Sequence, residues 1–196
     1  HWNKKKLNNI WADEVTLRRV KDILFNEFGE SKKINGICHG TRNGFEQNFF
    51  RSLSDNFNVF GTDISETAEN YENSIQWDFH NVNSDWKENQ DFIFTNSLDQ
   101  SWQPHVAVET WLSQLNQKGL LIIEHTEAHG PSEASKMDPF GIKPVVMPYV
   151  LSMWFGSQIS ISHSVAKKSN MNLNAWLFVI KKNVATVKLI QNEMTS

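Results

Sequence analysis

The chain has 196 residues, 39% of them hydrophobic, and a formal net charge of -3. This size and composition are those of a single globular domain and exclude an extended disordered chain. Without a basic excess, nucleic acid is not expected as a partner, and no run of about eighteen apolar residues indicates a membrane span. The single cysteine, Cys38, excludes an internal disulfide and a cysteine-based zinc site, and it favours a reducing, cytoplasmic compartment.

The first half of the chain alternates helical patterns with short apolar runs. Asp13 is suited to cap a helix over residues 14–28, in which Val20 and Leu24 share one face, and Gly29 is suited to end it. The residues before this helix are expected to form an arm that packs partly on the domain. Five further segments follow: strands at 34–38, 58–63 and 74–78, a helix at 45–55 and a short helix from 65.

The second half continues the alternation. We expect a strand at 91–96, a helix at 104–115 and a strand at 119–124, whose continuous apolar run is typical of a strand covered on both faces. Residues 125–144 read as a long loop, which is often a lid or a binding loop. Its closure over a substrate is a hypothesis.

Residues 145–155 are apolar almost all round and are therefore expected to be well buried. Two alternatives stay open for this segment: it packs on the sheet, or it packs against a second subunit in a homodimer. Residues 159–165 alternate with period two, and a polar turn leads to the apolar run 175–180, so we expect an antiparallel hairpin.

The order of these elements predicts an α/β fold. Alternating strands and helices imply a Rossmann-like, doubly wound, mostly parallel sheet with helices on both faces, to which the hairpin adds an antiparallel edge. We divide the chain into an arm and helix at 1–29, the main domain at 30–183 and a tail at 184–196.

Polar residues and glycines follow the predicted strands, at the edge where such a sheet binds ligands. Gly40 and Gly44 follow the first strand, and glycines there allow backbone to approach a ligand closely. Asp63 lies about twenty residues past this loop, at the distance at which a carboxylate accepts ribose hydroxyls. The same edge receives Asp78, Phe79, Asn96, Asp99, Glu124 and His125.

This pattern resembles the class I S-adenosylmethionine-dependent methyltransferases over about residues 34–181. That family has a seven-stranded sheet with a terminal antiparallel hairpin, and its first motif is an acid followed by three alternating glycines. Here the motif is a variant, Cys-x-Gly-x-Arg-x-Gly-x-Glu, in which Cys38 replaces the acid and Arg42 replaces the middle glycine.

The resemblance implies that S-adenosylmethionine is the cofactor and indicates which residues hold it. Asp63 matches the ribose-binding acid, with Ile64 beside the adenine, and Asp78 and Phe79 match the adenine-binding pair. Arg42 either holds the cofactor carboxylate or forms an ion pair with Glu46 or another nearby acid. The implied cofactor residues are His39, Gly40, Thr41, Arg42, Gly44, Asp63, Ile64, Asp78, Phe79 and Asn96.

We expect His125 or Asp99 to take the proton of a hydroxyl or amine acceptor. A mixed metal site of Asp99, Glu124 and His125 is an alternative that the spacing does not favour, and we expect no metal. The alternative interpretation of Asp99, Glu124 and His125 is that they are ordinary polar loop residues. His129, His105, His80 and His163 have no identifiable partner in the sequence and are interpreted as surface or core histidines.

The expected function is methyl transfer to a small-molecule, sugar-like or lipid-like acceptor. Asn96-Ser-Leu-Asp99 differs from the Asn-Pro-Pro-aromatic run of amino-directed DNA and protein-glutamine methylation. One rival is an NAD(P)-dependent oxidoreductase, although Gly-x-Gly-x-x-Gly is absent. The other rival is a protein that binds the cofactor without catalysis.

Overall fold

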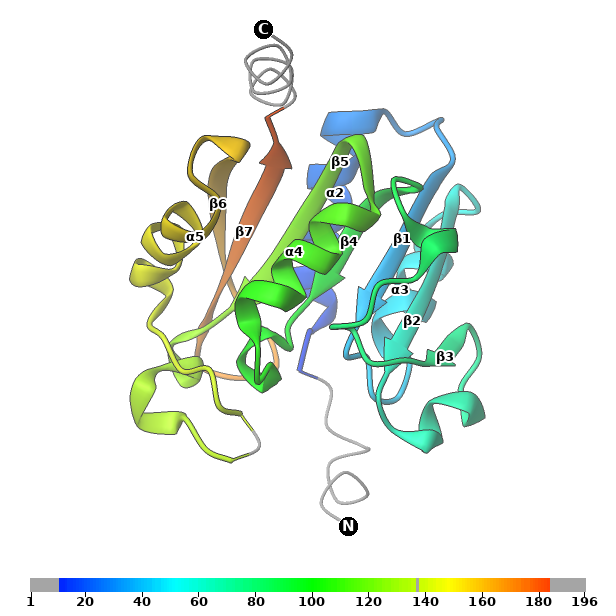
Figure 1. Ribbon diagram of the computed structural model, residues 1–196. Coiled ribbons are helices and arrows are strands. Elements are labelled where there is room, and N and C mark those ends of the chain that lie inside the picture. Colours follow the sequence, from blue (N-terminus) through cyan, green and yellow to red (C-terminus); the bar gives the residue numbers. More distant parts are fainter. Residues whose placement is uncertain (1–10, 137, 184–196) are drawn as a thin grey trace, which may run out of the picture.

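Figure 1 shows the computed structural model, which describes residues 11–136 and 138–183. Most of the predicted N-terminal arm and the whole predicted tail therefore lie outside the described residues. A seven-stranded sheet forms the centre, in the spatial order β3-β2-β1-β4-β5-β7-β6. Its strands are β1 (Ile34–His39), β2 (Phe57–Asp63), β3 (Ser74–Gln76), β4 (Gln90–Thr95), β5 (Leu115–His125), β6 (Ile159–Lys167) and β7 (Asn174–Lys182).

The sheet is parallel from β3 to β5 and becomes antiparallel where β7 pairs with β5 and β6. This confirms the predicted Rossmann-like sheet with a C-terminal antiparallel hairpin. Within the hairpin, the second strand, β7, lies next to β5 and leaves β6 at the edge of the sheet. Strand order reverses between β1 and β4, where a ligand cleft is expected in such a sheet.

Helices cover both faces of the sheet (Figure 1). Side chains that alternate along each strand enter two separate cores, as the period of a strand requires. Ile37, Ile93 and Leu121 pack with α4 and α5, whereas Cys38, Phe92 and Leu120 pack with α2 and α3. The helices are α2 (Glu14–Phe28), α3 (Phe45–Leu53), α4 (Pro104–Gln114) and α5 (Met147–Phe155).

Local sequence explains the ends of the helices. Asp13 caps α2 by accepting the Thr16 backbone N–H at 3.0 Å, and Gly29 ends it at φ 87°. Gly44 precedes α3 with φ 76°, a left-handed conformation that suits glycine. The predicted bounds of both helices agree with the structure to within two residues.

The prediction that residues 145–155 are well buried is wrong. Met147, Leu151 and Phe155 face the core, but Tyr149 and Met153 are each 68% exposed. Because α5 covers the antiparallel margin of the sheet from one side only, its outer face remains in contact with solvent. Packing against a second subunit therefore stays a prediction, which light scattering would test.

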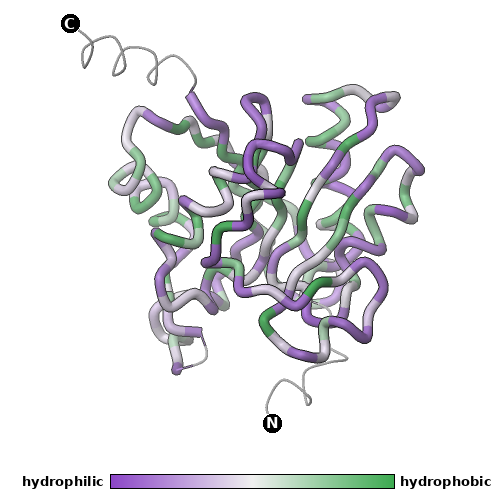
Figure 2. Tube along the Cα trace, turned by 45° about the vertical axis from the view of Figure 1, so that its right-hand side comes forward, coloured by the Kyte–Doolittle hydropathy of each residue, from purple (hydrophilic) through white to green (hydrophobic). Residues whose placement is uncertain are grey.

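Hydrophobic segments follow the strands and hydrophilic ones most of the connecting loops (Figure 2). Among the described residues, no helix is both long and apolar enough to cross a membrane. The carboxyl ends of β1, β2, β4 and β5 lie at the bottom of Figure 1, together with residues 11–13 and the loop after β5. This edge holds the candidate site.

Candidate functional site

A pocket of about 640 Å³ lies at the carboxyl ends of β1, β4 and β5. Since β4 lies between β1 and β5 in the sheet, the residues after β4 form the middle of the pocket and separate two walls. The glycine-loop wall consists of Gly40, Thr41, Arg42, Asn43 and Glu46. The histidine wall consists of Trp11, Ala128, His129, Gly130, Ala134, Asp138, Phe140, Gly141, Asn170 and Met171, and the middle consists of Asn96, Ser97, Asp99 and Gln100.

Backbone contacts hold the glycine-loop wall in place. The N–H groups of Gly40 and Thr41 both donate to the Thr62 carbonyl, at 2.8 and 3.0 Å. Gly40 has φ 76°, and a Cβ there would lie 2.4 Å from the Ser97 Oγ. The loop therefore needs glycine at this position both for its conformation and for the close approach of Ser97.

Asp63 ties the loop to the end of β2. Its Oδ2 accepts the Arg42 backbone N–H at 2.9 Å, and its Oδ1 accepts the Ser65 backbone N–H at 2.9 Å. Arg42 has φ 49°, which is uncommon for a residue with a side chain, and the hydrogen bond to Asp63 holds it there. A carboxylate has about four acceptor positions, so Asp63 keeps capacity for a ligand.

The predicted adenine-side residues lie beyond the pocket lining. Ile64 is 64% exposed beside Asp63. Asp78 accepts the His80 backbone N–H at 3.0 Å and contacts the His80 Nδ1 at 2.7 Å, and His80 in turn contacts the Ser101 Oγ at 2.7 Å. The Phe79 ring packs edge-on against Trp111 at 5.3 Å.

His39, also predicted to bind the cofactor, lies inside the core. Its ring contacts the Thr62 Oγ1 at 2.7 Å and the Gln114 Oε1 at 2.8 Å. Burial lowers the pKa of His39 to about 4, so the ring is neutral at pH 7. Its side chain is not part of the pocket lining.

Glu46 lies on the first turn of α3 and is 6% exposed. Its Oε1 accepts a hydrogen bond from the Asn96 Nδ2 at 3.2 Å, which links the glycine-loop wall to the end of β4. Burial raises the pKa of Glu46 to about 7, while its own amide, Asn96 and Arg42 act in the opposite direction. The sequence offered this residue only as a partner for Arg42.

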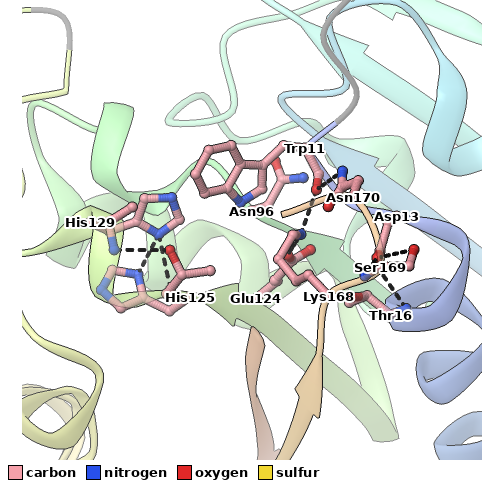
Figure 3. A network of polar contacts seen from close by, with 12 residues as sticks. Trp11, Asp13, Thr16, Asn96, Glu124, His125, His129, Lys168, Ser169 and Asn170 are labelled. Carbon is pink, nitrogen blue, oxygen red and sulfur yellow. Dashed lines mark hydrogen bonds and ion pairs between the residues drawn. The ribbon is translucent and has the colours of Figure 1, made fainter. Parts of the chain in front are cut away.

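Of the two predicted catalytic residues, Asp99 lines the pocket and His125 does not. His125 is 1% exposed, and its Nε2 contacts the Ile142 carbonyl at 2.8 Å. His129, interpreted from the sequence as a histidine without a partner, lines the pocket instead. Figure 3 shows the two rings side by side. Their Nδ1 atoms are 3.2 Å apart.

Local hydrogen bonds orient His129. Thr126 caps a short turn, Glu127–His129, and the Thr126 backbone N–H donates to the His129 Nδ1 at 3.2 Å. The neutral ring therefore carries its proton on Nε2, which lies 3.9 Å from the Asp99 Oδ2. Burial, together with His125 and Lys168, lowers the pKa of His129 to about 3, so the ring stays neutral at pH 7.

The histidine wall is anchored by a buried ion pair (Figure 3). Lys168, from the turn between β6 and β7, contacts the Glu124 Oε1, and both side chains are fully buried. The Lys168 Nζ also donates to the Trp11 carbonyl at 2.5 Å. Glu124, weighed as a metal ligand from the sequence, therefore has a lysine partner, and burial raises its pKa while Lys168 opposes the rise.

Asp13 completes this anchor. Its Oδ2 accepts hydrogen bonds from the backbone N–H and the Oγ of Ser169, the latter at 2.6 Å. Although burial alone would raise the pKa of Asp13, these hydrogen bonds and that from Thr16 hold it well below its usual value. The start of α2 and the hairpin turn are thereby joined, and Trp11 is placed over His129 with ring centroids 4.9 Å apart.

No three His, Cys, Asp or Glu side chains within residues 11–136 and 138–183 gather in a way that could hold a metal ion. Of the predicted site residues, the pocket brings together Gly40, Thr41, Arg42, Asn96 and Asp99. The others lie under it or along the same edge of the sheet. His129, Glu46 and Trp11 were missed, and only the Thr126-x-x-His129 capping pattern could have drawn attention to one of them.

Comparison with known proteins shows what this fold is similar to. No protein-family model and no curated protein matches the chain. Among solved structures, the plantazolicin methyltransferase BpumL in complex with a triazolic desmethylPZN analogue and S-adenosylhomocysteine matches with a TM-score of 0.71 and 12% identity, over 93% of this chain and 90% of that one.

Two further structures have the same fold. A 1,6-didemethyltoxoflavin-N1-methyltransferase from Burkholderia thailandensis, with S-adenosylhomocysteine bound, matches with a TM-score of 0.67 and 14% identity, over 89% of this chain and 81% of that one. The [4+2]-cyclase SpnF matches with a TM-score of 0.63 and 10% identity, over 85% and 80%. The chain therefore has the class I methyltransferase fold.

Proposed function

We propose that the protein is an S-adenosylmethionine-dependent methyltransferase acting on a small-molecule acceptor. The observation that carries this proposal is the pocket of about 640 Å³ bounded by the glycine loop at the switch point of the sheet. Two structures of similar fold were determined with S-adenosylhomocysteine, the product of the donor. The cyclase of the same fold means that fold similarity alone does not assign the reaction.

The donor would lie along the glycine-loop wall. We assign its ribose to Asp63, which already accepts two backbone N–H groups, and its adenine to the surface beside Ile64, Asp78 and Phe79. An exposed isoleucine next to a carboxylate suits a ligand with an apolar ring and a sugar. Gly40, Thr41, Arg42 and Asn96 would surround the other end, with Gly44 shaping the loop, and His39 is assigned a structural role in the core.

S-adenosylmethionine supplies a methyl group that is already activated on a sulfonium. The protein therefore needs to place an acceptor atom and, where required, remove its proton. Asp99 and His129 lie together in the pocket, 3.9 Å apart. We assign Asp99 to accept the proton and the His129 Nε2–H to donate to the lone pair of an acceptor oxygen that does not attack the methyl group.

His125 would act through His129. Its Nδ1 lies against the His129 Nδ1, and its Nε2 is fixed by the Ile142 carbonyl. We therefore assign His125 as a positioning residue, since it does not line the pocket.

Ligand binding distinguishes this function from its rivals. We expect S-adenosylhomocysteine to raise the unfolding temperature and to bind in calorimetry, and NAD and NADP to do neither. A large shift with a dinucleotide and none with S-adenosylhomocysteine would favour the oxidoreductase. A tritiated-methyl screen over candidate acceptors then separates an enzyme from a protein that only binds the donor.

A further inference from the structure

Among the described residues, no other residue donates a hydrogen bond to one of the two oxygens of the Glu46 carboxylate. Its Oε1 accepts the Asn96 Nδ2 hydrogen bond, whereas its Oε2 is buried and receives no hydrogen bond from any other residue in the part of the chain that the structure describes. The side chain is part of the pocket lining. A buried carboxylate oxygen without an external donor is costly, so a ligand that donates to it would be bound favourably.

The charges around Glu46 define the kind of donor that fits. Arg42, in the same wall, stabilises the charged form of Glu46, and Glu124 destabilises it. Burial raises the pKa of Glu46 to about 7, so a proton and a cation would compete for the carboxylate near neutral pH. A cationic N–H group from a ligand would replace the proton and form a charge-assisted hydrogen bond.

No neighbouring position provides another carboxylate in the glycine-loop wall. Cys38, where the resembling family has an acid, is fully buried in the core beneath α2 and α3. Asp63 faces the loop backbone at the end of β2, and Asp99 lies after β4 beside His129. Asp138 lines the pocket from the histidine wall, so within the glycine-loop wall Glu46 is the carboxylate and Arg42 is the cation.

We propose that Glu46 binds the primary ammonium group of the amino-acid end of the donor. This inference rests on the proposed function, because it takes the ligand to be S-adenosylmethionine. The amino-acid end carries an ammonium and a carboxylate, and the glycine-loop wall offers a carboxylate and a guanidinium. Glu46, on the first turn of α3, thus supplies the carboxylate that Cys38, in β1, lacks.

The test compares Glu46→Gln with the wild-type protein at pH 8, using two ligands in calorimetry. S-adenosylhomocysteine has the amino-acid end, and 5′-methylthioadenosine lacks it. We expect E46Q to lose tenfold or more affinity for S-adenosylhomocysteine, in the range of a lost charge-assisted hydrogen bond (about tenfold). Its affinity for 5′-methylthioadenosine should stay within about twofold of wild type, since neither protein would contact that ligand through Glu46.

Glu127→Gln is the matched control, because Glu127 is an exposed residue outside the pocket lining. It should change neither affinity. Equal losses for both ligands in E46Q would overturn the inference, as would an unchanged affinity for S-adenosylhomocysteine. Wild-type protein that binds neither ligand would overturn the proposed function as well. If E46Q does not fold, Glu46→Asp should show the same selective loss, because its carboxylate is one methylene shorter.

Discussion

The two walls of the pocket are held by different kinds of contact. The glycine-loop wall is held mainly by hydrogen bonds from backbone N–H groups. Those of Gly40 and Thr41 donate to the Thr62 carbonyl, and that of Arg42 donates to Asp63. In the histidine wall, side chains from distant segments meet, and Lys168 joins Glu124 to the Trp11 carbonyl. We infer that the first wall is suited to an invariant ligand and the second to an acceptor.

The largest effect on stability is expected from Lys168→Met. This change leaves Glu124 as a buried carboxylate without its cation and should lower the free energy of unfolding by about 3–5 kcal/mol. Urea denaturation measures it. Lys181→Met is the control, because the pair of Lys181 with Glu27 is 44% and 32% exposed and should contribute less than about 1 kcal/mol.

The double variant Lys168→Met, Glu124→Leu sharpens this result. Removing both charges leaves no unpaired carboxylate, so we expect most of the lost stability to return. Equal destabilisation in the single and the double variant would show that packing, and not the ion pair, anchors the histidine wall.

A pH-dependent effect is expected next, at Glu46. Its pKa is raised from 4.5 to about 7, so its contribution to stability is fully present below pH 4.5 and is lost as pH rises through 7. At pH 8 the Glu46→Gln variant should therefore be more stable than wild type by up to about 3 kcal/mol. Near pH 4.5 the difference should vanish.

Comparison with the variant is needed because His39 and His129, whose pKa values are lowered to about 4 and 3, titrate in the opposite sense. Their contributions are present above pH 6.5 and are lost as pH falls, but they cancel between wild type and variant. A stability difference that is the same at pH 8 and pH 5 would contradict the raised pKa of Glu46.

Gly40→Ala should remove most donor binding while the protein stays folded. Its Cβ would lie 2.4 Å from the Ser97 Oγ at a φ of 76°, so the loop must move, and we expect an affinity loss of about 100-fold for S-adenosylhomocysteine. Gly29→Ala is the control, because Gly29 has a similar φ of 87° and no atom of residues 11–136 or 138–183 beyond its chain neighbours would lie within 4 Å of the added Cβ. It should reduce stability only, and calorimetry separates the two outcomes.

A substitution in the histidine wall should reduce turnover and leave donor binding unchanged. Once an acceptor is identified, His129→Ala should lower kcat by about 100-fold, as for a lost hydrogen-bond donor in an active site. Its affinity for S-adenosylhomocysteine should stay within about twofold. His163→Ala, in an exposed part of β6, is the control. A loss of donor affinity in H129A as large as its loss of kcat would contradict the division of the pocket into a donor wall and an acceptor wall.

The sequence predicted the glycine-loop wall better than the histidine wall for a physical reason. Gly40, Gly44 and Asp63 act through local backbone geometry at the ends of adjacent strands, which spacing along the chain reflects. The Lys168–Glu124 pair joins residues 44 positions apart, and neither residue carries a local signal of the other. The role proposed for His129 depends on Asp99, which only the packing of the loop after β5 brings near.

The fold itself was largely predictable, because the strands β4 and β5 have continuous apolar runs that are bounded by polar residues. The prediction fails at α5 because an apolar composition does not require that a helix be covered on every face. Tyr149 and Met153 show that its outer face has no cover among the described residues.

The most direct test of the central claim is a crystal structure with S-adenosylhomocysteine. We expect its ribose at Asp63 and its amino-acid end against Gly40, Arg42 and Glu46, with the sulfur facing Asn96 and the space before Asp99 and His129. Ligand density elsewhere in the protein, or an empty pocket at a saturating concentration of S-adenosylhomocysteine, would contradict the assignment of the glycine-loop wall to the methyl donor.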